Sequence, residues 1–375
     1  MDCLIPTLKG TNSVCVKDIK DITGKKPAAK NEYCLIKQVT PKEIAQLAYS
    51  LQSGVTILPL LAQNKVFTAL QLSDKKLLEN VMQEGMTFAV RSIKEKEEKL
   101  SSEELHEEVG SFVSDWLTEI GITPKVSLSK PDITFLVVAT GEEYFVGIDV
   151  IGFRLCKRPY KLFLHPASIN ACIAYSIAKE AGITKDSVVL DPFCGTGTIP
   201  IEVALYQQSM SPFHFENKFT GLTIPFFKDS FEAVAQVEKN KKATKSKIFG
   251  FDAQLKMMTG SKQNAKIAGI KESIAFSKVA IDWIDAKFEK HEVDVIITQP
   301  PMISERVKNE KDILKLYDEL CYQSKYLLNK KGTLGVFVNH PEKFKIIANK
   351  HKLTFKKEIL MPIGDTNFSL VLFSP

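Results

Sequence analysis

The chain is 375 residues long, with 44% hydrophobic and 25% charged residues. This length exceeds that of one typical domain, so two or three domains are expected. Its seven cysteines form no CxxC pair, which argues against a zinc site or a disulfide framework and favours a reducing, cytoplasmic setting. The sequence shows neither a secretory signal at its start nor a run of about 18 apolar residues that would cross a membrane. The net charge of +6 permits a polyanionic partner without requiring one.

The N-terminal part of the chain carries two zones of mixed helix and strand. In residues 1–60, short apolar runs such as YCLI accompany PKEIAQLAYSLQSG, whose apolar residues fall at helical spacing. In residues 61–160, the strand candidates MTFAVRSI and ITFLVVATGEEYFVGIDVIG flank a charged helix that Ser101 or Ser102 can cap. The tetrapeptide TGEE predicts a hairpin turn. Both zones are expected to be α+β.

From about residue 166 onward the pattern changes to an alternation of helices and strands. Helical patterns such as ASINACIAYSIAKEAG and TIPIEVALYQQ separate the apolar runs SVVLD, KIFGFD, SIAFSKV, VDVIIT and TLGVFVN. This alternation predicts an α/β fold with a doubly wound, mostly parallel, Rossmann-like sheet. The last two strand candidates, KLTFKKEIL and FSLVLFS, are joined only by MPIGDTN. Because that segment is too short for a parallel crossover, an antiparallel edge strand is expected.

An insertion with its own helical pattern precedes KIFGFD. It ends in a group of lysines: Lys239, Lys241, Lys242, Lys245 and Lys247. Two interpretations are open for this group, a solvated helix end or a set of phosphate contacts.

The strand SVVLD leads into a glycine turn, DPFCGTGTIP. In open α/β sheets, ligands bind beyond the carboxyl ends of the strands. Gly195 and Gly197 let the backbone turn sharply and approach a ligand, and the amides that open the next helix favour an anionic group. A purely structural corner between strand and helix would use glycine for the same steric reason. The turn alone therefore does not decide between the two.

Acidic residues near this turn favour a binding site. Asp252 ends KIFGFD, where a carboxylate can accept both hydroxyls of an adenosine ribose. Asp282 and Trp283 follow the third strand and can take the adenine amino group and cover the base. Asp191 can receive the ammonium of a methionine moiety, and Pro200 breaks the dinucleotide pattern, so an aminoacyl adenosine fits better than NAD. The predicted cofactor-binding residues are Asp191, Pro192, Phe193, Cys194, Gly195, Thr196, Gly197, Asp252, Ala253, Asp282 and Trp283.

The segment DPFCGTGTIPIEVAL resembles the methyl-donor loop of class I S-adenosylmethionine-dependent methyltransferases that act on exocyclic amino groups. Upstream, FAVRSIKEKEEKLSSEELHEEVGSFV is similar to the first half of a THUMP domain, and VGIDVIGFRLCKRPYKLFLHPASINACIAYSIAKEAG to its end and the following linker. The start, LIPTLKGTNSVCVKDIKDITGKK, is similar to the ferredoxin-like unit that precedes THUMP in such proteins. The resemblance spans nearly the whole chain and is greatest to the tRNA guanine-N2 methyltransferases that modify position 6 of the acceptor stem.

This resemblance implies three domains: a ferredoxin-like unit in 1–60, a THUMP RNA-binding domain in 61–160, and an S-adenosylmethionine-dependent methyltransferase domain in 161–375. It implies S-adenosyl-L-methionine as the cofactor and tRNA as the partner, gripped at its acceptor end by THUMP. Exposed basic residues without a partner are the alternative for each phosphate contact. The implied phosphate contacts are Arg91, Lys94, Arg154, Lys157, Arg158 and Lys161.

The fourth strand ends in IITQPPMIS, which departs from the family pattern of Asn or Asp, two prolines or Leu-Pro, and an aromatic residue. In that pattern the first side chain and a proline carbonyl accept hydrogen bonds from the amine to be methylated, while the ring stacks on the extruded base. Carried over, the catalytic residues are Gln299, Pro300, Pro301 and Met302. Gln299 offers its amide oxygen one methylene further out, and Met302 offers only an apolar surface.

These departures leave two further interpretations open: a THUMP RNA-binding protein with a weakened or inactive methyltransferase fold, and the same enzyme type acting on ribosomal RNA. Cytosine-C5 methylation is excluded because it needs a cysteine beside the prolines, and the nearest, Cys321, falls in a predicted helix. The six histidines show no ligand spacing, so no metal is expected. The oligomeric state and the modified nucleotide are left open.

Overall fold

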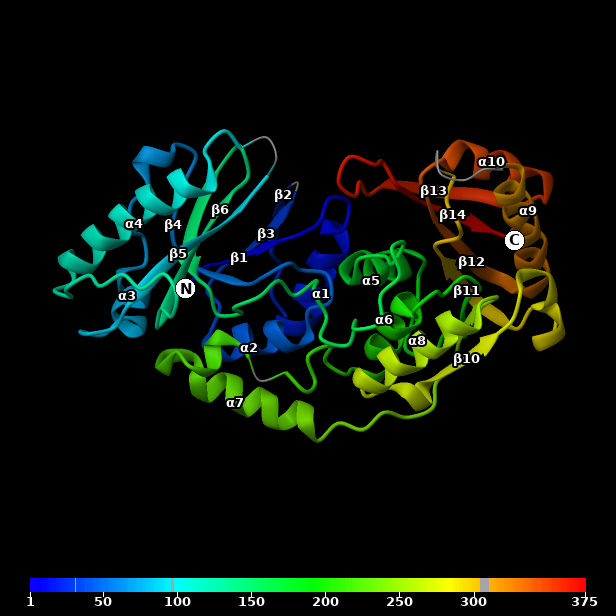
Figure 1. Cartoon of the computed structure of the whole chain (residues 1–375), viewed down its shortest axis with the longest axis horizontal. Coiled ribbons are helices and arrows are strands. Elements are labelled where there is room, and N and C mark those ends of the chain that lie inside the picture. The colour runs from blue at the N-terminus through cyan, green and yellow to red at the C-terminus, as the bar shows by residue number, and fades with distance from the viewer. Residues whose placement is uncertain (31, 96–97, 217, 304–309) are drawn as a thin grey trace. The chain divides into compact units, whose positions relative to one another are not determined.

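The computed structural model describes residues 1–30, 32–95, 98–216, 218–303 and 310–375. The chain forms two compact units, each built on a seven-stranded sheet (Figure 1). The first unit comprises Met1–Thr7, Cys15–Leu155 and Phe215–Lys239, and the second comprises Leu8–Val14, Cys156–His214 and Asn240–Pro375. Within the described residues, no helix has both the length and the apolar character that a membrane crossing requires.

The sheet of the first unit has the strand order β2-β3-β1-β4-β7-β6-β5. Its strands are β1 (Cys3–Pro6), β2 (Ala28–Lys30), β3 (Tyr33–Ile36), β4 (Leu58–Asn64), β5 (Phe88–Lys94), β6 (Ile133–Ala139) and β7 (Tyr144–Ile148). β4 pairs with β1 through Leu58 and Pro59, and with β7 from Leu60 onward. The division predicted between residues 60 and 61 therefore falls inside a strand that joins both halves of the sheet.

Five helices belong wholly or mainly to this unit: α1 (Asn12–Thr23), α2 (Pro41–Ser50), α3 (Lys75–Val81), α4 (Ser102–Glu119) and α7 (Pro225–Lys239). Short 3-10 turns lie at Phe67–Ala69 and Thr220–Leu222. Ser101 caps α4, since its hydroxyl accepts from the Glu104 amide at 3.1 Å while the Glu104 carboxylate accepts from the Ser101 amide at 2.7 Å. The predicted hairpin turn is also confirmed, with the Thr140 amide donating to the Glu143 carbonyl at 3.1 Å.

The inserted helix α7 lies against α2 (Figure 1). The Tyr49 ring of α2 lies with its centroid 4.7 Å from that of Phe219 and 6.4 Å from that of Phe231. Phe219, Phe227 and Phe231 are all fully buried. Residues 215–239, expected within a continuous domain from 161 to 375, instead complete the core of the first unit.

The sheet of the second unit has the order β10-β9-β8-β11-β12-β14-β13. Its strands are β8 (Val189–Asp191), β9 (Ile248–Asp252), β10 (Ile274–Lys278), β11 (Val293–Thr298), β12 (Leu328–Val338), β13 (Thr354–Leu360) and β14 (Ser369–Ser374). The five strands β8, β9, β10, β11 and β12 are parallel, and β14 is antiparallel to both of its neighbours. The predicted antiparallel pair is confirmed. The buried strand β14 lies between β12 and β13, and the largely exposed β13 forms the edge of the sheet.

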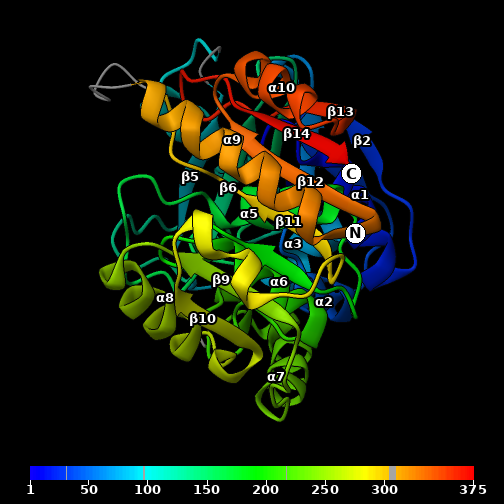
Figure 2. The ribbon, with the colours of Figure 1, turned by 90° about the vertical axis from the view of Figure 1, so that its right-hand side faces the viewer.

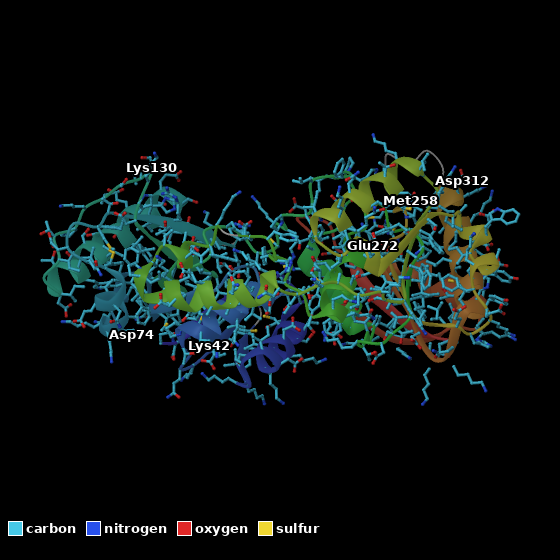
Figure 3. The ribbon with its side chains drawn as sticks, turned by 90° about the horizontal axis from the view of Figure 1, so that it is seen from below. Lys42, Asp74, Lys130, Met258, Glu272 and Asp312 are labelled. Carbon is cyan, nitrogen blue, oxygen red and sulfur yellow. The ribbon has the colours of Figure 1, made fainter. Side chains whose placement is uncertain are left out.

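Helices cover both faces of this sheet, as the doubly wound prediction requires (Figure 2). They are α5 (Ala171–Glu180), α6 (Thr198–Gln208), α8 (Leu255–Ile267), α9 (Glu310–Leu327) and α10 (Pro341–Lys350), with 3-10 turns at Lys271–Ser273, Ile281–Trp283 and Asp285–Lys287. Successive residues of a strand point to opposite faces of the sheet. Val189 therefore packs in the core with α5, α6 and α8, whereas Leu190 packs in the core with α9 and α10. Met258 of α8 and Asp312 of α9, labelled in Figure 3, mark helices of the two layers.

Candidate active site

The glycine turn lies between β8 and α6, at the carboxyl edge of the second sheet. Gly195 and Gly197 have φ of 51° and 86°, and Gly197 is the N-cap of α6. A Cβ on Gly197 would lie 3.0 Å from the Ser261 Cβ and 3.1 Å from the Phe276 ring. Both the left-handed conformation and this close approach require glycine.

Asp191, the last residue of β8, is buried beneath the turn. The Thr298 hydroxyl of β11 donates to its Oδ1 at 2.6 Å, and the Phe193 amide donates to the same oxygen at 3.2 Å. Burial raises the pKa of Asp191 to about 7; the two hydrogen bonds oppose this rise and the nearby Asp252 carboxylate adds to it. A cation placed at Asp191 would favour its ionised form.

Asp252, the last residue of β9, flanks the turn on the side of the neighbouring strand. Its Oδ2 accepts from the Gly195 amide at 3.2 Å and its Oδ1 accepts from the Gln254 amide at 2.8 Å. The Cys194 amide also donates to the Phe251 carbonyl at 2.8 Å, which ties the turn to β9. The structure therefore brings the Asp191 and Asp252 carboxylates to one glycine turn.

Ala253, Asp282 and Trp283 lie along the same edge of the sheet. Asp282 and Trp283 belong to the 3-10 turn Ile281–Trp283 that follows β10, and β10 pairs with β9 so that Lys278 lies opposite Asp252. All three side chains are exposed, and 66% of the Trp283 surface is open to solvent. The three predicted acidic positions thus follow the strand order β8, β9, β10 along one edge.

The segment TQPPMI leaves the sheet from β11, which is the parallel neighbour of β8. Gln299 and Met302 are both half-buried, and the Gln299 Nε2 lies 3.6 Å from the Met302 Sδ. Pro300 is buried and Pro301 is exposed. Because Thr298 directly precedes Gln299 and donates to Asp191, one hydrogen bond connects the glycine turn with the predicted catalytic segment.

Asn264 of α8 is a site residue that the sequence motifs did not single out. It is 1% exposed, and its Nδ2 donates to the Thr196 carbonyl at 3.0 Å and to the Phe163 carbonyl at 2.9 Å. Its Oδ1 accepts from the Phe163 amide at 3.0 Å, so the linker ahead of α5 is fastened to the glycine turn. A polar residue at helical spacing from the buried Met257 and Ser261 is the signal that could have found it.

The six basic residues predicted to contact RNA differ in burial. Arg91 and Lys94 on β5, together with Arg154 and Lys157, are exposed. Lys161 is half-buried; its ammonium donates to the Ile169 carbonyl, and burial lowers its pKa.

Arg158 requires a correction. Its guanidinium is fully buried and donates to both carboxylate oxygens of Glu202, Nε to Oε1 at 2.9 Å and Nη2 to Oε2 at 3.0 Å. The Tyr160 hydroxyl donates to Glu202 Oε1 at 2.7 Å. Since this buried pair cannot reach a phosphate, the prediction of an RNA contact at Arg158 is wrong, and the residue instead fastens the linker to α6.

The doubly wound sheet, with a glycine turn after its first strand and carboxylates beside that turn, defines a class I methyltransferase domain. Residues 158–368 match the family described as RMKL-like, methyltransferase domain, and residues 65–149 match the THUMP domain. The chain therefore belongs to the RMKL-like methyltransferase family and carries a THUMP domain, as the resemblance implied.

Similar proteins agree with this assignment. A tRNA (guanine(6)-N2)-methyltransferase of Methanocaldococcus jannaschii is 33% identical over 76% of this chain and 74% of the relative. A ribosomal RNA large subunit methyltransferase K/L of Vibrio parahaemolyticus is 29% identical over 52% of this chain and 28% of the relative. A methylase structure from Clostridium difficile 630 covers 100% of this chain and 98% of its own at 21% identity and a TM-score of 0.80. A methyltransferase solved with SAH covers 100% and 97% at 21% identity and a TM-score of 0.79. These two structures share the fold across both units.

Proposed function

We propose that this chain transfers a methyl group from S-adenosylmethionine to the exocyclic N2 amine of guanosine in tRNA, at position 6 of the acceptor stem. The observation that carries the proposal is the connected pair of sites at one sheet edge: a glycine turn with two carboxylates, and the TQPP segment on the adjacent strand. The relative from Methanocaldococcus jannaschii, which matches three quarters of the chain, supports the choice of substrate.

The glycine turn fits an aminoacyl adenosine. A Cβ on Gly195 would meet nothing within 4 Å, so the backbone there leaves room for close approach of a ligand, whereas Gly197 packs against Ser261 and Phe276. We assign the ammonium of the methionine moiety to Asp191, the ribose hydroxyls to Asp252, and the adenine to Asp282 and Trp283. Pro192, Phe193, Cys194, Thr196 and Ala253 complete the proposed pocket.

Catalysis in this proposal rests on orientation. The cofactor supplies a methyl group on a positively charged sulfur. Gln299, through its amide oxygen, and Pro300, through its carbonyl, accept hydrogen bonds from the amine and direct its lone pair, while Pro301 and Met302 shape the surface for the base. These two acceptors would hold the amine with its lone pair directed at the methyl group of the bound donor, and the proton that the methylated amine releases would pass to solvent.

For substrate selection, we assign phosphate contacts to Arg91, Lys94, Arg154 and Lys157, which are exposed, and a minor one to Lys161. We keep the domain assignment as a ferredoxin-like unit, a THUMP domain and a methyltransferase domain, with residues 215–239 added to the N-terminal core. We place the activity in the cytoplasm, in keeping with seven cysteines that are all free thiols.

Two alternatives follow from particular observations. The match to a large-subunit ribosomal RNA methyltransferase favours a ribosomal substrate, although it covers only 52% of this chain. Gln299 and Met302, which depart from the family pattern, favour an RNA-binding protein with weak turnover. Loss of base stacking costs roughly 1–3 kcal/mol, so Met302 weakens capture of the base without abolishing it.

The test is incubation of the purified protein with labelled S-adenosylmethionine and either unmodified tRNA or unmodified ribosomal RNA. We expect N2-methylguanosine at position 6 of tRNA, mapped by nuclease digestion and mass spectrometry. Gln299→Ala should lose activity and keep donor affinity. Donor binding without methylation of either RNA would favour the inactive alternative, and labelling of ribosomal RNA alone would overturn the choice of substrate.

A further inference from the structure

Two side chains fasten the TQPPMI segment from outside it. The hydroxyl of Tyr317 on α9 donates to the Pro301 carbonyl at 3.0 Å. The Nδ2 of Asn339, which directly follows β12, donates to the Ile303 carbonyl at 2.7 Å. Met302 lies between the two fastened carbonyls, so the segment that begins at Gln299 is held on both sides of this residue.

Tyr317 is a rigid anchor. Its side chain is fully buried in the core formed by α9, α10 and the sheet. Its ring packs edge-on against Phe344 of α10 at a centroid distance of 5.3 Å. Burial also raises the pKa of its hydroxyl, which favours the neutral form that donates the hydrogen bond. The position of the Pro301 carbonyl is therefore set by the core.

Asn339 is explained by the bond that it makes. Thr298 of β11 pairs with Val336 of β12, so Asn339 lies at the carboxyl end of the neighbouring strand. Its Oδ1 is buried and has no hydrogen-bond partner among the described residues. A buried acceptor without a partner destabilises a fold, and an apolar residue of similar size would avoid that penalty. It would also lose the bond to Ile303.

The chemistry of the segment shows why such anchors are needed. Proline has no amide hydrogen, so neither Pro300 nor Pro301 can be fixed through a backbone N–H. Gln299 has one more rotatable bond than the Asn or Asp of the family pattern, which gives its amide oxygen more positions to choose from. A displacement of about 1 Å in a group that orients a substrate can lower the rate on the order of a hundredfold.

We propose that Tyr317 and Asn339 are positioning residues that hold the TQPPMI segment, and through it the acceptor oxygens of Gln299 and Pro300, in the geometry that methylation requires. This inference rests on the proposed function. It assigns to α9 and β12 a role in the reaction that lies outside the sequence motif itself.

The first test compares Tyr317→Phe, which removes only the hydroxyl, with Tyr322→Phe, the same change at an exposed position of the same helix. For Tyr317→Phe we expect kcat for tRNA methylation to fall about tenfold, with KM for tRNA and the Kd of S-adenosylmethionine unchanged. Tyr322→Phe should match the wild type. Asn339→Leu should repeat the loss in kcat.

A second measurement separates this inference from the proposed function. Hydrogen exchange of the Met302 and Ile303 amides, followed without RNA or donor, should speed up in Tyr317→Phe and stay unchanged in Tyr322→Phe. This result is expected even if the wild type methylates no tRNA. Unchanged exchange and kcat in both Tyr317→Phe and Asn339→Leu would overturn the inference. So would a loss of activity that only follows the loss of folded protein.

Discussion

Asp191 is a buried carboxylate whose pKa burial raises to about 7. If the donor ammonium binds here, its positive charge favours the ionised form and lowers that pKa in the complex. Below pH 7 the ligand must then displace a proton in order to bind. Donor binding at this residue is therefore expected to be linked to proton release.

We predict that the affinity for S-adenosylmethionine rises with pH up to about 7, by at most tenfold per pH unit, and then levels off. Calorimetry at pH 6.5 in buffers of different ionisation enthalpy should detect the released proton. In Asp191→Asn the affinity should be lower and the pH dependence absent. Asp252→Asn, the matched control, should also weaken binding but keep the pH slope. If the affinity of the wild type did not depend on pH, the assignment of the donor ammonium to Asp191 would be wrong.

The sequence predicted which individual residues lie at the site better than it predicted their hydrogen bonds and their burial. The motif indicated that Asp191 and Asp252 lie near one turn, because both end strands of a parallel sheet. It did not predict that Thr298 bonds Asp191, since that contact depends on β11 pairing directly with β8. Nor did it distinguish Arg158 from Lys157, which are adjacent and equally basic. Only the packing buries one and exposes the other.

A glycine can be required at the start or end of a helix for two reasons: a left-handed backbone conformation, or a lack of space for a Cβ. Gly197 and Gly182 both have left-handed φ, 86° and 88°, but a Cβ at Gly182 would meet nothing within 4 Å. Gly182→Ala should lower the unfolding free energy only by the strain of a left-handed alanine, about 1–2 kcal/mol. Gly197→Ala adds contacts with Ser261 and Phe276, so we predict a further loss of about 1–3 kcal/mol in unfolding free energy.

Denaturant unfolding measures both losses, and titration with S-adenosylmethionine supplies the functional readout. Only Gly197→Ala should weaken donor binding, because only that change displaces the turn. Equal stability and equal donor affinity for the two variants would show that the space around Gly197 is not limiting.

The buried pair of Arg158 and Glu202 joins the linker to helix α6. Arg158→Ala would leave the Glu202 carboxylate buried without its cation, so we predict a loss of about 3–5 kcal/mol in unfolding free energy. Lys157→Ala, one residue away and exposed, should stay within about 0.5 kcal/mol of the wild type. In RNA binding the order reverses, and Lys157→Ala should reduce the salt slope by about one. A stable Arg158→Ala protein with weakened RNA binding would restore Arg158 as an RNA contact.

At the scale of the whole molecule, the sequence predicted the α/β class, the antiparallel pair and the THUMP resemblance, since each depends on local periodicity or a contiguous motif. The course of the chain could not be predicted in this way. Helix α7 shows an amphipathic pattern, and such a pattern does not identify which core its apolar face will join. The structure shows that it joins α2, so the chain leaves the second unit after His214 and returns at Asn240.

The N-terminal unit is therefore incomplete as a continuous segment. Phe219, Phe227 and Phe231 are fully buried in that unit, and burying one such ring stabilises a fold by about 1.5–3 kcal/mol. Together these three contributions are comparable to the whole stability of a domain, about 5–15 kcal/mol.

We predict that residues 1–155 alone either aggregate or unfold at a lower temperature than the same segment joined to residues 215–239 by a flexible linker. Circular dichroism and size-exclusion chromatography would compare the two. Replacing Phe231 with Ala in the joined form should remove much of the gain, because that ring packs on Tyr49. A fragment of residues 1–155 that unfolds as cooperatively as the joined form would mean that α7 only lies on a core already complete without it.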